Sequence, residues 1–170
     1  MPEILWDFNS CTLPLDYLLH VVGPQKAREF SISSTQISNP SALEITMGVT
    51  RYKTKTNRKK EGVCSGWLSR AQPENGDSVP IWIKEGTMNG HEGSPLVLVG
   101  PGTGVAPFRA IVKERVLKGE TASTLLFYGG RWRARDFLYE HEWRELEKQS
   151  GGGFELVACF SRDQEHKVYV

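Results

Sequence analysis

The stretch SPLVLVGPGTGVAPFR, from Ser94 to Arg109, constrains the fold of this chain more than any other part of the sequence. It begins with a short, uninterrupted apolar run, which is typical of a strand buried on both faces in a parallel sheet. Three glycines at a spacing of two follow the run. Pro107 then stands just inside an apolar pattern with steps of three and four residues, which predicts a helix. We therefore expect a buried strand, a glycine-rich turn and a helix in direct succession.

The alternation of strand and helix continues to the end of the chain. The sequence predicts strands at residues 94–100, 123–130 and 154–160, with a second helix at 136–149 that the run GGG ends. The first helix has an apolar stripe of Val105, Phe108, Val112 and Val116, widened by Ile111. The second has a weaker one of Leu138, His141 or Glu142, Glu145 and Leu146. Strands that alternate with helices predict a parallel sheet with right-handed crossovers.

The first half of the chain has a different pattern. Three stretches have the alternation or the β-rich composition of strands: residues 27–34, 42–52 and 78–86. Residues 1–25 are expected to form an irregular lead-in with one or two helical turns, the basic stretch 53–62 an exposed loop, and residues 62–71 a short helix. We therefore expect two domains, a mostly β domain at residues 1–90 and the start of a doubly wound α/β domain at residues 91–170.

Composition excludes several classes of function. The 170 residues carry a formal net charge of +1, so no strong field favours nucleic acid or an anionic membrane. The longest apolar runs are far too short to span a bilayer, and the N-terminus lacks the pattern of a signal peptide. The three cysteines form no CxxC pair and the histidines show no ligand spacing, so no metal site or disulfide is expected. A reducing, cytoplasmic location fits this cysteine usage best.

The glycine turn has the chemistry of an anion-binding loop. A helix start presents unpaired N–H groups and the positive end of the helix dipole. Gly102 and Gly104 carry no Cβ that would keep a diphosphate away from the backbone, and Thr103 adds a hydroxyl. The turn has no following lysine, so it is not a Walker A loop, and its GxGxG spacing differs from the GxGxxG dinucleotide fingerprint. A tight turn without a ligand remains the alternative.

The ends of the next two predicted strands carry cationic and hydroxyl groups. After the second strand, Arg131 and two further arginines stand where NAD-binding folds usually have a carboxylate. Guanidinium groups there favour the 2′-phosphate of NADP. The third strand is followed by Ser161 and Arg162, and soon afterwards by Lys167 and Tyr169. These groups suit a phosphate beside an adenine ring, although an ordinary charged surface loop is the alternative.

As a set, five segments resemble the ferredoxin–NADP reductase superfamily and, within it, the diflavin reductases related to cytochrome P450 reductase. The segments are REFSISS, GVCSGWL, GPGTGVAPFR, FYGGR and FSRDQEHKVYV, in that order. The tryptophan-containing stretch RWRARDF…EWRELEK adds to a similarity with the branch that serves cytosolic iron–sulfur assembly. The resemblance implies a partial flavin-binding antiparallel β-barrel followed by an incomplete parallel-sheet NADP-binding domain.

The resemblance also implies the residues that would bind FAD. Arg28 would pair with the FAD pyrophosphate, Phe30 would pack on the isoalloxazine, and Ser31 would lie beside flavin N5 as the catalytic residue. Glu29 belongs to the same motif. The second motif would hold the FAD diphosphate through backbone N–H groups and a hydroxyl, and comprises Gly62, Val63, Cys64 and Ser65. Without the resemblance, Arg28 and Ser31 would be interpreted as the solvent face of a strand, and Cys64 as a small buried residue.

For NADPH, the resemblance implies two groups of contacts. The diphosphate would lie on Gly102, Thr103 and Gly104. The 2′-phosphate end would be held by residues after the second and third strands: Arg131, Ser161, Arg162, Lys167, Val168, Tyr169 and Val170. At Gly130 many relatives have a cysteine near the nicotinamide, so a thiol contribution is not expected there.

The function implied by the resemblance is that of an enzyme, an NADPH-dependent flavin oxidoreductase. Electrons would pass from NADPH to FAD, then to FMN in a flavodoxin-like domain outside this sequence, and on to an anamorsin-like iron–sulfur assembly protein. Because fewer strands are found than the family uses, we expect a truncated chain with weak FAD binding and little or no NADPH oxidation. The alternatives are an electron donor of the P450 or sulfite reductase type, and a non-catalytic truncated isoform.

Overall fold

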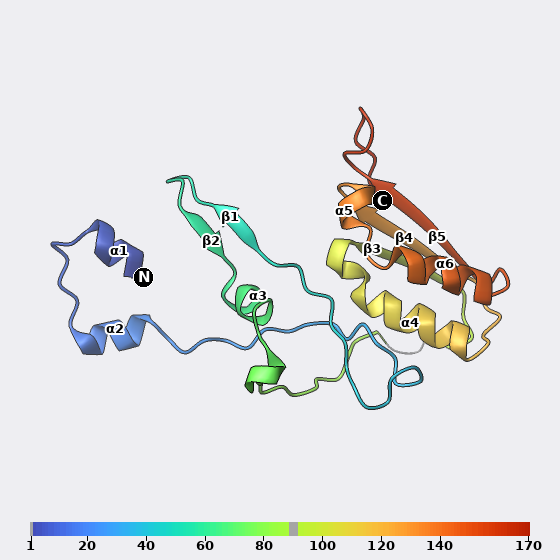
Figure 1. Ribbon diagram of the computed structural model, residues 1–170, viewed down its shortest axis with the longest axis horizontal. Coiled ribbons are helices and arrows are strands. Elements are labelled where there is room, and N and C mark those ends of the chain that lie inside the picture. Colours follow the sequence, from blue (N-terminus) through green and yellow to red (C-terminus); the bar gives the residue numbers. More distant parts are fainter. Residues whose placement is uncertain (1, 89–91) are drawn as a thin grey trace.

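The structure is a computed structural model that describes residues 2–88 and 92–170. The predicted domain boundary between residues 90 and 91 lies outside the described residues. The chain is elongated (Figure 1). A C-terminal α/β unit occupies one end, the first two helices lie at the other, and a β-hairpin and a short helix lie between them.

The C-terminal half forms the predicted parallel sheet. Its strands β3, β4 and β5 lie side by side in sequence order and pair in parallel. The elements in chain order are β3 (Leu96–Pro101), the 3₁₀ helix η2 (Gly102–Val105), α4 (Ala106–Leu117), β4 (Thr124–Gly130), α5 (Arg133–Asp136), α6 (Glu140–Gln149) and β5 (Phe154–Phe160). Strands of this length between crossover helices give the βαβαβ pattern that the sequence predicts.

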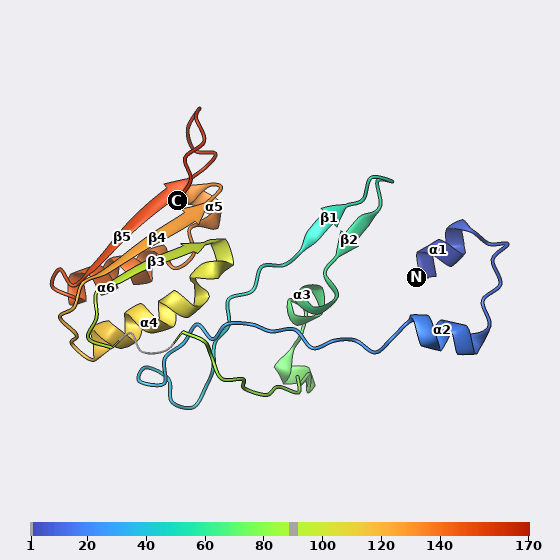
Figure 2. The same ribbon diagram turned by 180° about the vertical axis from the view of Figure 1, so that it is seen from behind.

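One face of this sheet is covered and the other is open. Helices α4 and α6 both lie on the same face, as Figures 1 and 2 show from opposite sides. Leu126 and Tyr128 of β4 and Val112 of α4 are fully buried there. On the opposite face of β3, Val97 and Val99 are 70% and 51% exposed. The expectation that this apolar strand is buried on both faces is therefore wrong, because no described helix packs on the second face.

Helix α6 differs from the predicted helix at 136–149. It begins at Glu140, and the short helix α5 precedes it. Between the two helices the backbone of Tyr139 is left-handed, with a φ of 62°, which interrupts the helical path. The buried stripe of α6 consists of Trp143 and Leu146, whereas the predicted core position Glu145 is exposed. The weak apolar period of this helix therefore placed Glu145 wrongly in the core and did not identify Trp143 as a core residue.

The N-terminal half contains short elements. These are α1 (Pro2–Asp7), α2 (Leu15–Val21), β1 (Arg51–Lys53), β2 (Lys59–Glu61), α3 (Val63–Leu68) and the 3₁₀ helix η1 (Pro73–Asn75). Helix α2 confirms the predicted helical turns of the lead-in, and α3 confirms the predicted short helix. Strands β1 and β2 pair antiparallel as a hairpin, so the basic stretch predicted as a loop contains a strand.

Two strand predictions in this half are wrong, and a third holds only at its end. The described residues 27–34 and 78–86 contain no ladder strand, and only the last residues of 42–52 belong to one. A single antiparallel bridge joins Ile32 to Ile45. An alternating sequence becomes a strand only when a neighbour completes its hydrogen bonds, and these segments run extended without such a neighbour. Residues 2–88 thus form a two-stranded antiparallel sheet and do not close a barrel.

Within residues 2–88 and 92–170, each helix is too short or too polar to cross a lipid bilayer.

Candidate functional site

The glycine loop lies where the sequence predicts it, at the carboxyl end of β3 and directly before α4. Gly100 is required by packing, because a Cβ there would lie 2.8 Å from the Phe108 ring and 2.9 Å from Cα of Val105. Gly102 has a φ of +54°, which favours glycine. At Gly104 the nearest atom to an added Cβ would be 3.8 Å away, on Pro101. The first glycine therefore shapes the turn, and the third leaves the backbone accessible.

The open side of this loop has the donors that an anion needs. Gly102 and Thr103 open η2, so their N–H groups precede the first i→i+3 hydrogen bond and have no acceptor within the helix. Thr103 and Gly104 are exposed, so a ligand can approach. The loop residues thus fit a diphosphate, with main-chain donors and the positive end of a helix on one side.

The predicted 2′-phosphate residues at the end of β5 lie on the same edge of the sheet as the loop. The register pairs Pro101 of β3 with Gly129 of β4, and Gly129 with Cys159 of β5. The Ser161 N–H donates to the Gly130 carbonyl at 3.0 Å, and the Arg162 N–H donates to the Arg131 carbonyl at 2.9 Å. These contacts hold the loop after β5 beside the loop after β4. Two strand spacings, about 9–10 Å, separate it from β3.

The last residues of the chain turn back toward this edge. An added Cβ at Gly129 would lie 3.2 Å from Cγ2 of Val170 and 3.4 Å from Cβ of Pro101. The predicted contacts Lys167, Val168 and Tyr169 are exposed. The last residue of the chain, Val170, therefore lies against the end of β4, the strand between β3 and β5.

The arginines after β4 differ in their surroundings. The Arg131 side chain is exposed and lies 3.6 Å from the carboxylate of Asp136. The Arg133 guanidinium pairs with Glu140 at 2.9 Å and lies over the ring of Phe137. Both backbones are bonded to the loop after β5, Arg133 through its N–H to the Asp163 carboxylate at 2.9 Å. The Arg131 side chain has the longer ion pair and the greater exposure, so it is the more accessible to a ligand at the sheet edge.

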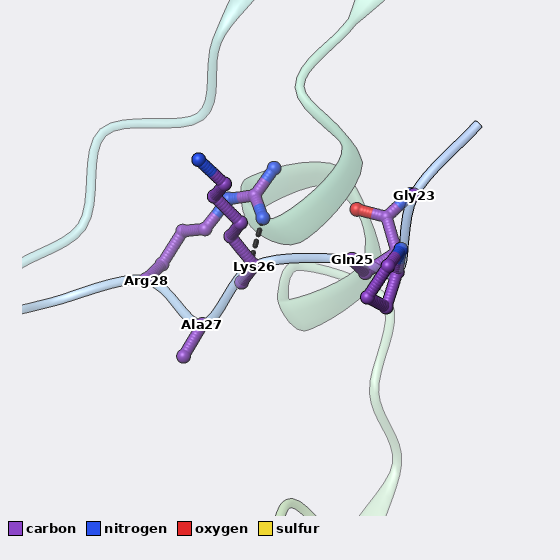
Figure 3. A pocket seen from close by; sticks show the side chains of 6 residues that line it. Gly23, Gln25, Lys26, Ala27 and Arg28 are labelled. Atoms are coloured by element: carbon purple, nitrogen blue, oxygen red, sulfur yellow. Dashed lines mark hydrogen bonds between the residues drawn. The ribbon is translucent and has the colours of Figure 1, made fainter. Parts of the chain in front are cut away.

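The first predicted flavin motif lies on an extended segment. Arg28 and Ser31 are exposed and Phe30 is half-buried. The Arg28 guanidinium turns back to the carbonyl of Lys26, beside an open hollow lined by residues 23–28 (Figure 3). Glu29 pairs with Lys84 at 2.5 Å, and this hydrogen bond lowers the pKa of the Glu29 carboxyl. The motif is therefore accessible, and its acidic residue is paired within the same half of the chain.

The second predicted flavin motif forms the start of α3. The Gly62 N–H donates to the Thr50 carbonyl at 2.8 Å, and the Thr50 N–H donates to the Ser65 hydroxyl at 3.1 Å. An added Cβ at Gly62 would lie 2.5 Å from that hydroxyl. The N–H groups of Val63, Cys64 and Ser65 belong to the first helical turn and so have no acceptor within the helix. This start of α3 therefore fits a diphosphate, with Ser65 also tying the helix to Thr50, the residue before β1.

The structure brings some predicted residues together and leaves others apart. Arg131, Ser161, Arg162, Val170 and the glycine loop share one sheet edge. Among the described residues, no hydrogen bond or ion pair joins either flavin motif directly to that edge. The two halves meet instead through residues 32–48: an added Cβ at Gly48 would lie 3.5 Å from Cγ2 of Thr103.

Sequence reasoning missed the polar cluster at this junction, which we call the Arg109 cluster: Ser33, Glu44, Arg109, Tyr139 and Glu142. The Arg109 side chain is only 9% exposed. Its Nε and Nη2 donate to the two carboxylate oxygens of Glu142 at 2.7 and 3.1 Å. Its Nη1 donates to the Ser33 carbonyl at 3.0 Å and to the Glu44 carboxylate. Its guanidinium carbon lies 4.4 Å from the centre of the Tyr139 ring.

The charges of the cluster reinforce one another. Burial alone would lower the pKa of Arg109, but hydrogen bonds to Glu142 and Glu44 outweigh it and raise that pKa. Burial alone would raise the pKa of Glu142, but hydrogen bonds from Arg109 and Lys113 outweigh it and lower that pKa. A signal was present in the sequence, because Arg109 lies four residues after Val105 and three before Val112, on the apolar stripe of the helix.

Comparison with known proteins agrees with the two halves. A model described as "FAD binding domain" matches residues 1–67, and one described as "Oxidoreductase NAD-binding domain" matches residues 98–170. The glycine loop and the loop after β5 fall within the second match. Both predicted flavin motifs fall within the first, apart from the last residue of GVCSGWL.

Several curated relatives are similar over nearly the whole chain, and each is named NADPH-dependent diflavin oxidoreductase 1. The protein from Bos taurus is 44% identical, that from Xenopus laevis 42% and that from Arabidopsis thaliana 40%, each over 99% of this chain. The chain spans 28% of the length of each of these three relatives. With both domain matches in this order, the chain is similar over nearly its whole length to NADPH-dependent diflavin oxidoreductases.

Proposed function

We propose that this chain is the FAD- and NADPH-binding part of an NADPH-dependent diflavin reductase. Residues 1–90 would form the FAD-binding domain and residues 91–170 the NADP-binding domain. The observation that carries the proposal is the shared sheet edge: the glycine loop and the loop after β5 lie on it with the end of β4 between them. The chain also matches FAD- and NAD-binding models in turn.

On the NADPH side, each part of the edge has a separate task. The N–H groups of Gly102 and Thr103 would bind the diphosphate, with Gly104 leaving room for it. Arg162, with Arg131 and Lys167, would supply positive charge to the 2′-phosphate, and Ser161 a hydroxyl. Tyr169 would offer a ring for the adenine. The distance between the loops after β3 and β5 suits a ligand with two separated phosphate groups.

On the flavin side, the start of α3 would hold the FAD diphosphate through the N–H groups of Val63, Cys64 and Ser65. Arg28 is exposed and would release its contact with Lys26 to pair with the same group. Phe30 and Ser31 would lie against the flavin ring, and Ser31 would contact the atom that receives hydride. Bound FAD supplies the chemistry that side chains lack, because it accepts two electrons as hydride and releases them singly.

The proposal extends to the electron path beyond this chain. Electrons would pass to FMN in another domain and then to a cytosolic, anamorsin-like iron–sulfur assembly protein. The name diflavin oxidoreductase, shared by relatives from animals, plants and fungi, supports the first step. The second step rests on the similarity of the tryptophan-containing stretch described above.

The NADP-binding part of the proposal is tested by comparing NADP⁺ with NAD⁺. Calorimetry on the purified chain measures both dissociation constants before and after Arg162→Ala. Because a charged hydrogen bond to phosphate is lost, we expect NADP⁺ to bind about 10–100-fold more weakly and NAD⁺ to be unaffected. Lys148→Ala is the control, since this exposed cation in the last turn of α6 pairs with Glu145 at 3.0 Å, at the opposite end of the helix from Glu140. Equal weakening of both nucleotides by Arg162→Ala would overturn the proposal.

The flavin part has its own test. FAD titrated into the chain is followed by the quenching of flavin fluorescence. Binding that Arg28→Ala and Ser65→Ala weaken and Lys148→Ala leaves unchanged would support the assignment. Saturable NADP⁺ binding without any FAD binding would confine the function to the C-terminal half.

A further inference from the structure

We infer that Arg109 is a positioning residue that holds the flavin-contacting segment of the N-terminal half at a fixed place against the NADP-binding half. That this segment contacts the flavin rests on the proposed function. That Arg109 joins the two halves does not depend on a bound cofactor. The inference concerns Arg109, Ser33, Glu44 and Glu142, to which the sequence analysis assigns no cofactor contact.

The contacts of Arg109 cross from one half to the other. Ser33 and Glu44 belong to the N-terminal half, whereas Glu142 belongs to α6 and Arg109 to α4. One guanidinium therefore binds a backbone carbonyl and a carboxylate of one half and, through two further hydrogen bonds, a carboxylate of the other. Arg109 forms ion pairs with both carboxylates, and its side chain is almost fully buried. Exposed ion pairs, by contrast, contribute little to stability because solvent screens them.

Two further contacts cross the same junction. The Tyr139 and Thr46 hydroxyls are 2.7 Å apart. The Thr35 hydroxyl donates to the Glu114 carboxylate at 3.3 Å. Ser33, Ser34 and Thr35 are all buried, although they are polar. The junction is thus a polar interface with defined partners, and a polar interface fixes geometry through the directions of its hydrogen bonds.

The position of Arg109 in the sequence connects both proposed cofactor sites. It follows Gly104 by five residues on the helix that the glycine loop opens. Its acceptor Ser33 follows Ser31, the proposed flavin contact, by two residues on one extended segment. A shift of this arginine would therefore move the proposed hydride acceptor relative to the proposed hydride donor. Hydride transfer needs the reacting atoms about 3–3.5 Å apart, and displacement by 1 Å can cost about 100-fold in rate.

The geometry requires an arginine. Its planar group donates in parallel to two oxygens of Glu142 while a third nitrogen reaches Ser33 and Glu44, and its face lies over Tyr139. A lysine keeps the charge but has neither the fork nor the plane. Arg109→Lys therefore tests directional bonding, and Arg109→Ala tests the whole contact.

Helix α4 offers a matched control. Arg115 is also a buried arginine, with its side chain 4% exposed. Its guanidinium donates to the Ser94 and Ala122 carbonyls and pairs with Glu120 at 3.2 Å. These partners lie in the C-terminal half, so Arg115→Lys disturbs a buried arginine without touching residues 32–46.

Hydrogen exchange on the purified 170-residue chain tests the structural part without any cofactor. The Ser33 amide, bonded to the Glu44 carbonyl, and the Glu44 amide, bonded to the Ser34 hydroxyl, are the reporters. We expect Arg109→Ala to speed their exchange at least about tenfold, Arg109→Lys to do so less, and the β4 amides to stay unchanged. Arg115→Lys should leave both reporters unchanged. Unchanged reporters in Arg109→Ala, or equal acceleration by both lysine variants, would overturn the inference.

Flavin reduction by NADPH tests the positioning part. In the chain loaded with FAD, rapid mixing with excess NADPH measures the first reduction. We expect Arg109→Lys to slow it about 10–100-fold, with the dissociation constants of NADP⁺ and FAD changed less than twofold, and Arg115→Lys to leave the rate unchanged. A parallel loss of affinity and rate, or an unchanged rate, would contradict positioning. Absence of FAD binding in the unaltered chain would refute the proposed function instead, while the exchange experiment still decides whether Arg109 joins the halves.

Discussion

The C-terminal half builds a core of its own, whereas the N-terminal half does not. Among the side chains that the structure describes, all the buried apolar ones lie between residues 98 and 160, including Val105, Leu126, Tyr128 and Trp143. Among residues 5–88, where side chains are described, the buried residues are Ser33, Ser34, Thr35 and Gly66. Large apolar side chains of that half are exposed instead, with Trp6 at 84% and Ile81 at 72%.

The difference follows from how each half brings its residues together. In a βαβ unit, each strand buries its side chains under the next helix, so the core forms from neighbours in the sequence. An antiparallel β domain gathers strands from distant parts of the chain and has a core only when enough of them pair. The N-terminal half is held to the other half chiefly by polar contacts at the Arg109 cluster. The free energy of unfolding should therefore depend on the C-terminal core. The placement of the N-terminal half against the C-terminal half should depend on the junction.

The largest expected effect is in the core of the C-terminal half. Trp143 is fully buried and its indole N–H donates to the Leu138 carbonyl at 2.8 Å. We expect Trp143→Ala to lower the free energy of unfolding by about 3–5 kcal/mol, measured by urea denaturation. Trp6→Ala is the control in the other half and should change it by less than about 0.5 kcal/mol. Similar losses in both variants would contradict the contrast between the halves.

The next effect is the pH dependence of the Arg109 cluster. Because the pKa of Glu142 is lower in the folded chain than the ordinary glutamate value of about 4.3, its ion pair stabilises the fold above that value. The stabilisation is lost as the pH falls from there through the folded pKa. Glu142→Gln should therefore cost about 1.5–3 kcal/mol at pH 7 and lose less stability than the unaltered chain between pH 5 and pH 3. An equal acid loss in both proteins would show that Glu142 is not the group responsible.

Two glycines of the same loop give a smaller and sharper comparison. At Gly100 an added Cβ would meet Phe108 and Val105, whereas at Gly104 it would meet no atom closer than 3.8 Å. We expect Gly100→Ala to cost about 1–3 kcal/mol in unfolding free energy. Gly104→Ala should leave stability nearly unchanged but weaken NADP⁺ binding, because its methyl group would enter the proposed diphosphate site. Denaturation and calorimetry on both variants separate the two roles, and a reversed pattern would contradict them.

The smallest effect is expected at an exposed ion pair within the N-terminal half. Glu29 and Lys84 lie 2.5 Å apart, with side chains 77% and 63% exposed. Solvent screens such a pair, so Lys84→Met should leave the melting temperature unchanged at physiological salt. A clear drop would mean that this half depends on its surface pairs more than the comparison implies.

The sequence predicted the C-terminal half well, because its apolar period and glycine turns are local signals. The strands after 94 and 123 and the helix with Val105 and Val112 lie where they were expected. The strands at 27–34 and 78–86 were wrong, because alternation shows which face a strand would bury but not which neighbour it would pair with. Trp143 was missed because charged residues interrupt the apolar pattern of its helix.

For the candidate site, the sequence predicted the loops better than the junction. The glycine loop and Ser161 were expected at the carboxyl edge, since parallel strands all end there. Arg109 was not singled out, because a charged residue on an apolar stripe has meaning only once its partners are known. Glu44 and Glu142 are distant in sequence from Arg109, and only the folded chain brings them to it.

The central claim is that one edge of the sheet, from the glycine loop to the loop after β5, binds NADP. The most direct test is titration of the ¹⁵N-labelled chain with NADP⁺, followed by amide chemical shifts. The account predicts that the largest shifts fall on Gly102, Thr103, Ser161 and Arg162, with the amides of β1 and β2 unmoved. Saturating shifts that fall elsewhere, or the absence of any shift at these four residues, would contradict it.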